Sequence, residues 1–371
     1  MTLFDRYLAK EILLPFVAGV VFLTQLLLAT QLLAQADVLF GSGVSPVDIA
    51  AVIVDLLPHM LGYVLPIAFL LGAVIGVGRL AEDREVIALA AAGVSPARLV
   101  RVPLALAVVT AAIGLWMSLS LEPAALAAGR ERLNDVVKRN VTSDVRAGTF
   151  YDQIPGYTLY AERVHGGRWE NVLISDHSNP SSPVLALAKT GGLEPVGEGE
   201  EMQLVLGNGE LHRETAAADE YATAEFRRAS LVIGLGTALR DRNALASSAR
   251  EMTAPAMRAR IRDARSRGDA AEAWRFEGYF HRRLAQPLAV IPFALLALPL
   301  GASRRVGRAF AVGATLLAVV AHYVLLRGGE VLAQKGALPA AVALQLPTIV
   351  LSAVALLLVA HQARRGVGAV R

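Results

Sequence analysis

Residues 49–78 read IAAVIVDLLPHMLGYVLPIAFLLGAVIGVG, a run in which Asp55 is the only charged side chain. The hydrocarbon core of a bilayer is about 30 Å thick, and a helix needs about 20 mostly apolar residues to cross it. We therefore predict that this run is a membrane-spanning helix. It is long enough to tilt or to project beyond the bilayer.

Further apolar segments lie on both sides of this run. Those that are long enough to span, or nearly so, are Ile12–Leu33, Leu99–Leu121, Leu284–Leu300, Ala309–Leu326 and Leu338–Ala360. The first of them is followed by Ala34-Gln35-Ala36, which resembles a signal-peptidase site. The apolar core of a signal peptide is about 7–15 residues long, however, and this run is longer. We expect a retained helix, and six spanning helices in all.

The composition agrees with a membrane protein. Of 371 residues, 54% are hydrophobic and 18% are charged, whereas soluble domains average about 45–50% and about 25%. The formal net charge of +4 is too small to indicate a nucleic-acid partner. The absence of cysteine excludes disulfide scaffolds, thiol catalysis and Cys-ligated zinc.

The positions of lysine and arginine predict the orientation, because cytoplasmic loops are enriched in both. One set of helix ends carries Arg6, Lys10, Arg79, Arg84, Arg98, Arg101, Arg304, Arg305, Arg308, Arg364, Arg365 and Arg371. The opposite loop between Leu33 and Ile49 carries none. We therefore expect both termini in the cytoplasm. Arg282 and Arg283 fall on the outer side, next to a long polar interval where the rule has little force.

The polar interval, residues 122–280, has the composition of a water-exposed domain. We expect a helix from Glu122 to about Asn140, followed by short strands. The strand-like segments are Thr158–Tyr160, Val172–Ile174, Val184–Ala188, Met202–Leu206 and Leu231–Ile233. Turns are expected at Gly166-Gly167, Gly191-Gly192 and Gly207-Asn208-Gly209. This pattern predicts a β-sandwich or an open jelly roll, from which an arginine-rich, solvated helix within Met252–Glu277 leads back to the membrane.

No feature of the chain predicts catalysis. The sequence contains no G-x-x-x-x-G-K-[ST] phosphate loop, so we expect no ATP site. His165, His177 and His212 lack the spacing of metal ligands. We interpret them as surface or turn residues and expect no cofactor or metal in this chain.

The segment between the second and third spanning helices predicts a short helix at about residues 81–93. Glu82 and Asp83 would lie in its first turn, where acidic groups favour the helix dipole, and Gly93 would end it. Such a helix either fits a groove on a cytoplasmic partner or is a plain connector, and spacing alone favours neither. Just before it, Gly72 and Gly76 form a small-xxx-small pair, which lets two helices approach closely.

Ionisable groups within the spanning segments are candidate functional residues because they are costly in a bilayer. Asp55 and His59 are four residues apart, on one helical face, and could pair. Arg327 and Glu330 lie at the outer end of the fifth segment. These groups either satisfy one another at the interface or line an outward-facing cavity for an anionic, amphipathic ligand.

Four stretches together resemble the LptF/LptG permease family, the membrane subunits of the bacterial lipopolysaccharide exporter. They are Arg6-Tyr7-Leu8 with Lys10-Glu11, Pro58 to Leu80, Glu85 to Ser95, and Arg283-Leu284-Ala285 to Gly301. The order of three helices, an outer domain and three helices also corresponds. The resemblance implies six transmembrane helices (3+3) with an inserted periplasmic β-jelly-roll domain, in the bacterial inner membrane. We place the divisions at 1–121, 122–280 and 281–371.

The resemblance also implies partners and site residues. It implies a paralogous permease subunit, an LptB-like ATPase dimer that binds ATP and Mg, a single-helix LptC-like subunit, an LptA-like periplasmic bridge and lipopolysaccharide as substrate. Glu85 matches the family's acidic coupling residue. The candidate coupling residues are Glu82, Asp83, Glu85, Val86, Ala88, Leu89 and Gly93. Family members often carry basic residues at the outer end of the first helix, where this chain has glutamines. The cavity candidates are Gln31, Gln35, Asp55, His59, Arg327 and Glu330.

We therefore predict a non-catalytic permease subunit of an ATP-driven lipopolysaccharide exporter, slightly closer to LptF than to LptG. Two alternatives remain. One is a secondary transporter with Asp55 and His59 as a proton relay, although the sequence shows no inverted repeats with broken midplane helices. The other is a mechanotransmission or sensor protein of the ABC type that transports nothing.

Overall fold

The computed structural model divides into two compact units. It describes residues 3–34, 45–132, 147–151, 156–165, 167–177, 183–196, 201–215, 220–233, 248–302 and 307–365. Residues 1–33, 53–127 and 248–371 form a helical unit, and residues 34–52 and 128–247 form a β unit.

The helical unit confirms the predicted fold class. The helices before the β strands are α1 (Leu3–Ala34), α3 (Pro46–Glu82), α4 (Glu85–Ala91) and α5 (Pro96–Trp116), which continues through the π-helix η1 (Met117–Leu121) to Arg132. Those after the strands are α8 (Ser248–Glu251), α9 (Ala254–Ser266), α10 (Ala270–Leu288), α11 (Val290–Gly301), α12 (Gly307–Gln334), α13 (Ala340–Ala343) and α14 (Leu346–Arg365). Six of the described helices, three before the strands and three after them, are long and apolar enough to cross a membrane when α10 and α11 are taken as one.

Prolines explain where the fourth spanning segment deviates from a straight helix. α10 ends at Leu288 and α11 begins at Val290, with Ala289 in a turn between them. Pro292 has no N–H group to donate to the carbonyl of Leu288, so the regular hydrogen-bond ladder breaks at this point. Pro287, just before the break, packs on Gly114 of α5, where a Cβ atom would lie 3.0 Å from the Pro287 ring.

The small-xxx-small pair marks a close helix contact, as the sequence predicts, and the partner helix is α1. A Cβ atom on Gly72 would lie 2.7 Å from the backbone of Phe16, and one on Gly76 would lie 2.7 Å from the carbonyl oxygen of Glu11. Any larger residue at these positions would therefore separate the two helices. The rings of Phe16 and Phe69 also meet edge to face, with centroids 5.7 Å apart.

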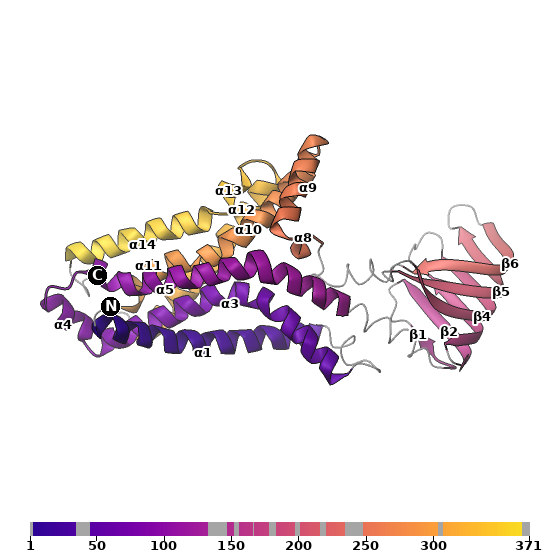
Figure 1. Ribbon diagram of the computed structural model, residues 1–371, viewed down its shortest axis with the longest axis horizontal. Coiled ribbons are helices and arrows are strands. Elements are labelled where there is room, and N and C mark those ends of the chain that lie inside the picture. The colour runs from indigo at the N-terminus through magenta and orange to yellow at the C-terminus, as the bar shows by residue number, and fades with distance from the viewer. Residues whose placement is uncertain are drawn as a thin grey trace. The chain divides into compact units, whose positions relative to one another are not determined.

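The two ends of the helical bundle differ. The start of α1, the end of α14 and the short helix α4 lie at one end, whereas α8, α9 and α13 lie at the other (Figure 1). We call these the α4 end and the α13 end. The main apolar core near the α4 end joins α1, α3, α4, α5 and α11, and Ile12, Phe69 and Ala294 are fully buried in it.

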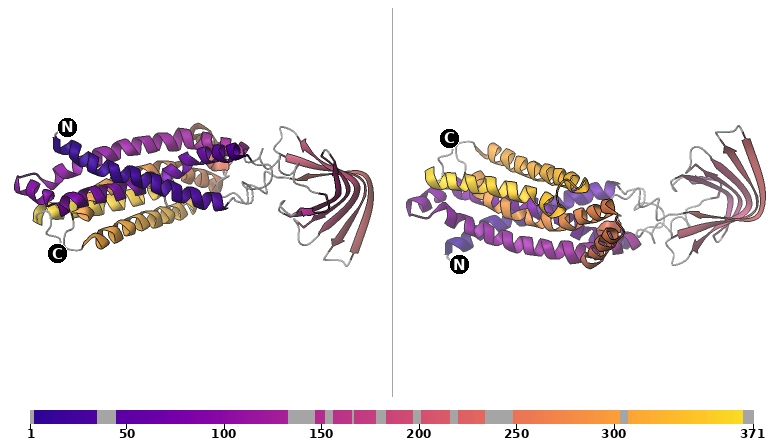
Figure 2. Two further views of the ribbon diagram at one scale, coloured as in Figure 1. Left: turned by 90° about the horizontal axis from the view of Figure 1, so that it is seen from below. Right: turned by 90° about the horizontal axis from the view of Figure 1, so that it is seen from above.

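The β unit contains one six-stranded antiparallel sheet with the strand order β1-β2-β3-β4-β5-β6. The strands are β1 (Phe150–Tyr151), β2 (Tyr157–His165), β3 (Arg168–Asp176), β4 (Val184–Val196), β5 (Glu201–Thr215) and β6 (Glu220–Ile233). Each strand pairs with its neighbour in sequence, and the sheet is strongly curved (Figure 2). Its buried residues include Leu159, Trp169, Ile174 and Leu204.

Two predicted turns are wrong, although Gly167 does lie in a turn between β2 and β3. Gly191-Gly192 lies inside β4, and Gly207-Asn208-Gly209 lies inside β5. Asn208 has the left-handed conformation that a hairpin turn requires, with φ 51°, but it kinks the strand instead of reversing it. Gly209 is needed for close packing, because a Cβ atom there would collide with the backbone of β4 and lie 2.7 Å from the ring of Phe226.

Asn171 makes the same kink in β3, also with φ 51°. Its amide Nδ2 donates to Oε2 of Glu162 on β2, at 2.5 Å. Before Asn171, the buried side chain is at an odd-numbered position, Trp169. After it, the buried side chains are at even-numbered positions, Val172 and Ile174. The left-handed residue thus shifts the alternation by one, so that the same face of the sheet stays apolar on both sides.

Candidate functional site

The short helix α4 is smaller than the sequence predicts. Glu82 is the last residue of α3, Asp83 and Arg84 form a turn, and Glu85 is the acidic residue in the first turn of α4. The placement of Glu82 and Asp83 in that first turn is therefore wrong. The reason is Arg84, whose φ of 61° no α-helix can contain. Gly93, with φ 83°, ends the segment as predicted.

α4 has one buried face and one free face. Val86 is 2% exposed and belongs to the same core as Leu8 of α1 and Leu99 of α5, and Leu89 packs against that core. Ile87 and Ala88 point outward and are exposed. The helix is therefore held firmly by its apolar side and presents a small, apolar surface on the other side.

Polar contacts connect α4 and the end of α3 to the first helix. The hydroxyl of Tyr7 donates to Oε1 of Glu85, at 3.3 Å. One turn further along α1, Oε2 of Glu11 pairs with Nη1 of Arg79, at 3.0 Å. Sequence reasoning noted Tyr7 and Glu11 only as parts of a motif, because nothing in local spacing shows that they face residues about 70 positions away.

At the α13 end, His59 of α3 pairs with Glu122. Nδ1 of His59 lies 2.7 Å from Oε1 of Glu122, and the hydroxyl of Ser118 donates to Oε2, at 3.2 Å. Both partners of the pair are about nine-tenths buried. Ser118 belongs to the π-helix η1, and such segments occur frequently at functional sites. Glu122 lies at the start of the polar interval in the sequence, and no local spacing there indicates that it pairs with His59.

A second polar group at this end is centred on Glu330 of α12. Its Oε1 lies 2.8 Å from Nη1 of Arg282 on α10, and its Oε2 lies 2.6 Å from Nη1 of Arg327. The side chain of Glu330 is 8% exposed, that of Arg282 25% and that of Arg327 73%. Arg282 also donates to the hydroxyl of Tyr63, at 3.0 Å. The carboxylate of Glu330 thus binds two guanidinium groups, that of the mostly buried Arg282 and that of the exposed Arg327.

Arg283, the neighbour of Arg282, binds backbone instead of a carboxylate. Its guanidinium donates to the carbonyl oxygens of Ala249, Arg250 and Met252, at 3.3 Å to the first and 2.7 Å to the last. These three groups belong to α8 and the residue after it, where the chain rejoins the helical unit. The side chain thereby satisfies carbonyls that a four-residue helix leaves unpaired.

Of the remaining candidate cavity residues, two lie in the described part of the chain and one does not. Gln31 lies half-buried on α1, and Asp55 lies half-buried on α3, one turn before His59. Gln35 lies outside the described residues. Arg327 and Glu330 form an ion pair, whereas the sequence left open whether such groups satisfy one another or line a cavity.

The arginine-rich helix α9 is exposed, but its charges are largely paired with α10. Arg260 and Arg267 bind the carboxylate of Glu272, and Arg265 binds that of Glu277. The hydrogen bond to Glu272 raises the pKa of Arg267 above its usual value. These pairs close α9 and α10 into a helical hairpin. Arg258 and Arg262 of α9 are also exposed, and the guanidinium of Arg258 lies 5.0 Å from the centre of the Phe280 ring.

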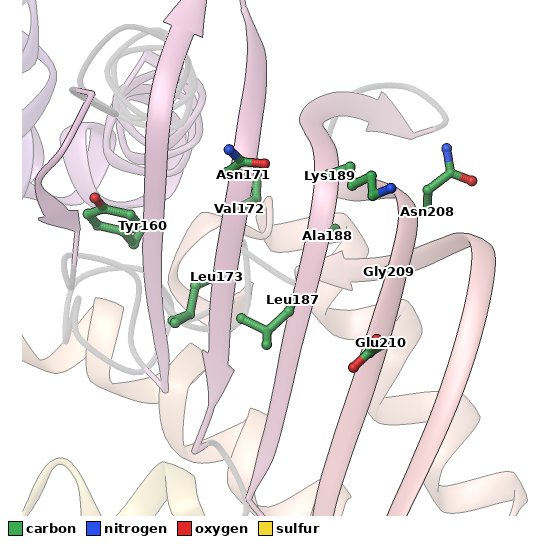
Figure 3. Close-up of a pocket in the computed structure, with 10 residues that line it drawn as sticks. All are labelled: Tyr160, Asn171, Val172, Leu173, Leu187, Ala188, Lys189, Asn208, Gly209 and Glu210. Carbon is green, nitrogen blue, oxygen red and sulfur yellow. The ribbon is translucent and has the colours of Figure 1, made fainter.

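The β unit carries a shallow groove of about 430 Å³ along its sheet. The residues that line it are Tyr160, Asn171, Val172, Leu173, Leu187, Ala188, Lys189, Asn208, Gly209 and Glu210 (Figure 3). The register places Tyr160 beside Leu173, and Leu173 beside Leu187, so three apolar side chains form a row. Within the described part of the chain, no cluster of three or more His, Asp or Glu side chains is suited to hold a metal ion.

Comparison with known proteins gives related chains along most of the sequence. A family model described as lipopolysaccharide export system permease LptF/LptG matches residues 6–361. The uncharacterized protein RP871 of Rickettsia prowazekii is 26% identical over 199 residues, which are 53% of this chain and 55% of that protein. The lipopolysaccharide export system permease protein LptF of Escherichia coli K12 is 24% identical over 233 residues, 62% of this chain and 63% of that protein. The chain thus spans less than two thirds of the length of these relatives.

Proposed function

The chain belongs to the LptF/LptG family of lipopolysaccharide export permeases, and from this premise we propose that it is a non-catalytic membrane subunit of an ATP-driven exporter. It would extract lipopolysaccharide from the inner membrane and deliver it towards a periplasmic bridge. The α4 end would face the cytoplasm and the β unit the periplasm. The positive-inside pattern supports this orientation.

The observation that carries the proposal is the construction of α4. A helix of seven residues is held in the core by Val86, while Ile87, Ala88 and the last residues of the helix remain exposed. A short amphipathic helix with one anchored face and one free face suits docking into a groove on a partner. We propose that this partner is a dimeric ATPase of the LptB type, which binds ATP and Mg, and that Glu85 contacts it.

An external energy source is needed because the cargo is held by its acyl chains. Each CH₂ group removed from an apolar environment costs about 0.8 kcal/mol, so one chain of about ten CH₂ groups resists extraction by about 8 kcal/mol. A lipid with several chains therefore does not leave the bilayer at a useful rate unaided. The apolar face of the curved sheet in the β unit is suited to shield such chains from water.

The polar groups at the α13 end would line the outer part of the route that the lipid takes. Lipopolysaccharide is anionic, and the side chain of Arg327 is 73% exposed although its Nη1 binds Glu330. We propose that Arg327 attracts phosphate groups of the lipid at the outer mouth of the cavity. Glu330 would hold the side chain of Arg327 in place, because guanidinium and carboxylate form strong, directional pairs.

The spanning helices differ in how much surface they leave open to partners. In the most apolar 18-residue stretch of each helix, the share of residues buried within this chain is 61% for α3 and 61% for α10–α11. It is only 6% for α1 and 17% for α12. Such exposure suits lipid or other helices. We propose that these faces meet a paralogous permease and a single-helix subunit of the LptC type.

The test is the replacement Glu85→Arg, with Glu225→Arg on β6 as the matched control. The charge reversal at Glu85 is expected to abolish co-purification of the ATPase from detergent, while insertion into the membrane and the amount of protein stay unchanged. The control reverses an exposed carboxylate of the β unit and should leave the complex intact. Normal recovery of the ATPase with the Glu85→Arg chain would contradict the assignment of α4.

A further inference from the structure

The chain connects α4 directly to two spanning helices. The turn at Asp83 and Arg84 links it to α3, and the segment from Ala92 to Ser95 links it to α5. A displacement of α4 therefore reaches these two helices through covalent bonds. Along the chain, α1 is separated from α4 by the whole of α3, so only side-chain contacts can transmit a movement directly to it.

Such contacts lie on one face of α1. Tyr7 and Glu11 are one turn apart, so they project from the same side of the helix. The hydroxyl of Tyr7 donates to Glu85 on α4, and Glu11 pairs with Arg79 at the end of α3. Between these two contacts, the neighbouring Leu8 is 1% exposed and shares a core with Val86 of α4.

Further along, α1 is fixed to α3 by backbone packing. The backbone of α3 at Gly76 packs against the carbonyl of Glu11, and at Gly72 it packs against the backbone of Phe16. A Cβ atom on Gly19 of α1 would lie 3.5 Å from the Cβ atom of Ala68. Helices that touch through glycine along such a length behave as one body, because a small shift brings backbone atoms into collision. A force on Tyr7 would therefore act on α1 and α3 together.

The conformation of the turn indicates that α4 needs side-chain support. Arg84 has φ 61°, a conformation that L-residues rarely adopt and that persists only where surrounding contacts maintain it. The hydrogen bond from Tyr7 ends on Glu85, the next residue. It occupies Oε1 of Glu85, and none of the residues that the structure describes donates a hydrogen bond to Oε2.

We infer that Tyr7 is a positioning residue that fastens the first spanning helix to α4 and orients the carboxylate of Glu85. α1 then moves with α4 when α4 is displaced, in addition to the two helices that the chain itself connects. The effect of Tyr7 on transport rests on the proposed function. The link that Tyr7 makes between α1 and α4 is a property of this chain alone.

The fastening is tested first in the full chain without any partner. The sequence contains no cysteine, so nitroxide labels attach only at introduced sites. The labels are measured in lipid nanodiscs. The distance between α1 and α4 is reported by labels at Leu14→Cys and Ala91→Cys. The distance between α1 and α3 is reported by labels at Leu14→Cys and Ile75→Cys. Tyr7→Phe is expected to broaden the α1–α4 distance distribution at least twofold and to leave the α1–α3 distribution unchanged. Tyr279→Phe, at the α13 end, should change neither.

The variant Glu85→Gln separates the hydrogen bond from the charge, because an amide oxygen still accepts from Tyr7. This variant should keep the narrow α1–α4 distribution, and adding Tyr7→Phe to it should broaden the distribution again. An α1–α4 distribution that Tyr7→Phe leaves unchanged would overturn the inference. Broadening of both distributions would overturn it too, because the phenol would then support the bundle in general.

The second arm uses the complex with the ATPase and measures lipid released per ATP hydrolysed. Tyr7→Phe is expected to lower this ratio about fivefold, which corresponds to the loss of one exposed hydrogen bond worth about 1 kcal/mol, with normal ATPase binding. An unchanged ratio would overturn the role of Tyr7 in coupling. If no ATPase bound the unmodified chain, the proposed function would fail, while the label distances would still decide whether Tyr7 fastens α1.

Discussion

Replacing Glu330 by alanine should destabilise the helical unit by about 3 kcal/mol. The carboxylate lies between two guanidinium groups, and the variant leaves Arg282, which is 25% exposed, without its charged partner. Breaking such a largely buried pair costs about 2–3 kcal/mol, somewhat less than the roughly 3–5 kcal/mol typical of fully buried pairs, because Arg282 retains some contact with water. The pair with Arg327, whose side chain is 73% exposed, adds at most about 1 kcal/mol.

The assay is unfolding in mixed micelles titrated with sodium dodecyl sulfate, followed by the fluorescence of Trp116 and Trp274 in the helical unit, with Trp169 of the β unit replaced by phenylalanine in every chain compared. Arg327→Ala is the matched control and should lower stability by less than about 1 kcal/mol. The double variant Arg282→Met with Glu330→Leu should return to within about 1 kcal/mol of the unmodified chain, because the only partner that it leaves unpaired is the exposed side chain of Arg327. A Glu330→Ala chain as stable as the Arg327→Ala chain would refute this reasoning.

Three further predictions concern packing and backbone contacts. Gly76→Leu should lower the stability of the helical unit by at least about 2 kcal/mol in the same titration, because its side chain would collide with the carbonyl of Glu11; Gly62→Ala, where a Cβ atom meets nothing within 4 Å, should have no destabilising effect. Gly209→Ala should weaken β4–β5 pairing, seen as faster amide hydrogen exchange confined to the β unit. Arg283→Ala should increase proteolysis at residues 248–252 at least tenfold, because it removes the donor for three carbonyls; equal cleavage rates would contradict the role given to this guanidinium.

The order of the large elements could be predicted because it depends on local composition. Six apolar stretches and one polar interval are visible in the sequence, and the cost of apolar surface in water and of charge in lipid leaves few alternatives. The contact at Gly72 and Gly76 was also predictable, since small residues one turn apart commonly mark a close helix pair. The sequence did not show that α1 is the partner.

The polar partners were not predictable, because they depend on which helices become neighbours. His59 could have paired with Asp55 by spacing, yet its contact is Glu122, 63 positions away. The contact between Tyr7 and Glu85 spans 78 positions. Asn208 shows a different limit: an Asn-Gly pair indicates a left-handed backbone, but only the surrounding sheet decides whether that backbone reverses the strand or kinks it.

The central claim is that this chain carries lipid only when an ATPase at its α4 end supplies the energy. The most direct measurement is the transfer of fluorescent lipopolysaccharide from proteoliposomes to a soluble acceptor, with and without the ATPase and ATP. We predict transfer only when the chain, its paralogous permease, the ATPase and ATP are all present, and none with Glu85→Arg. Transfer by the chain without ATPase or nucleotide, at a rate equal to that of the complete system, would contradict the account.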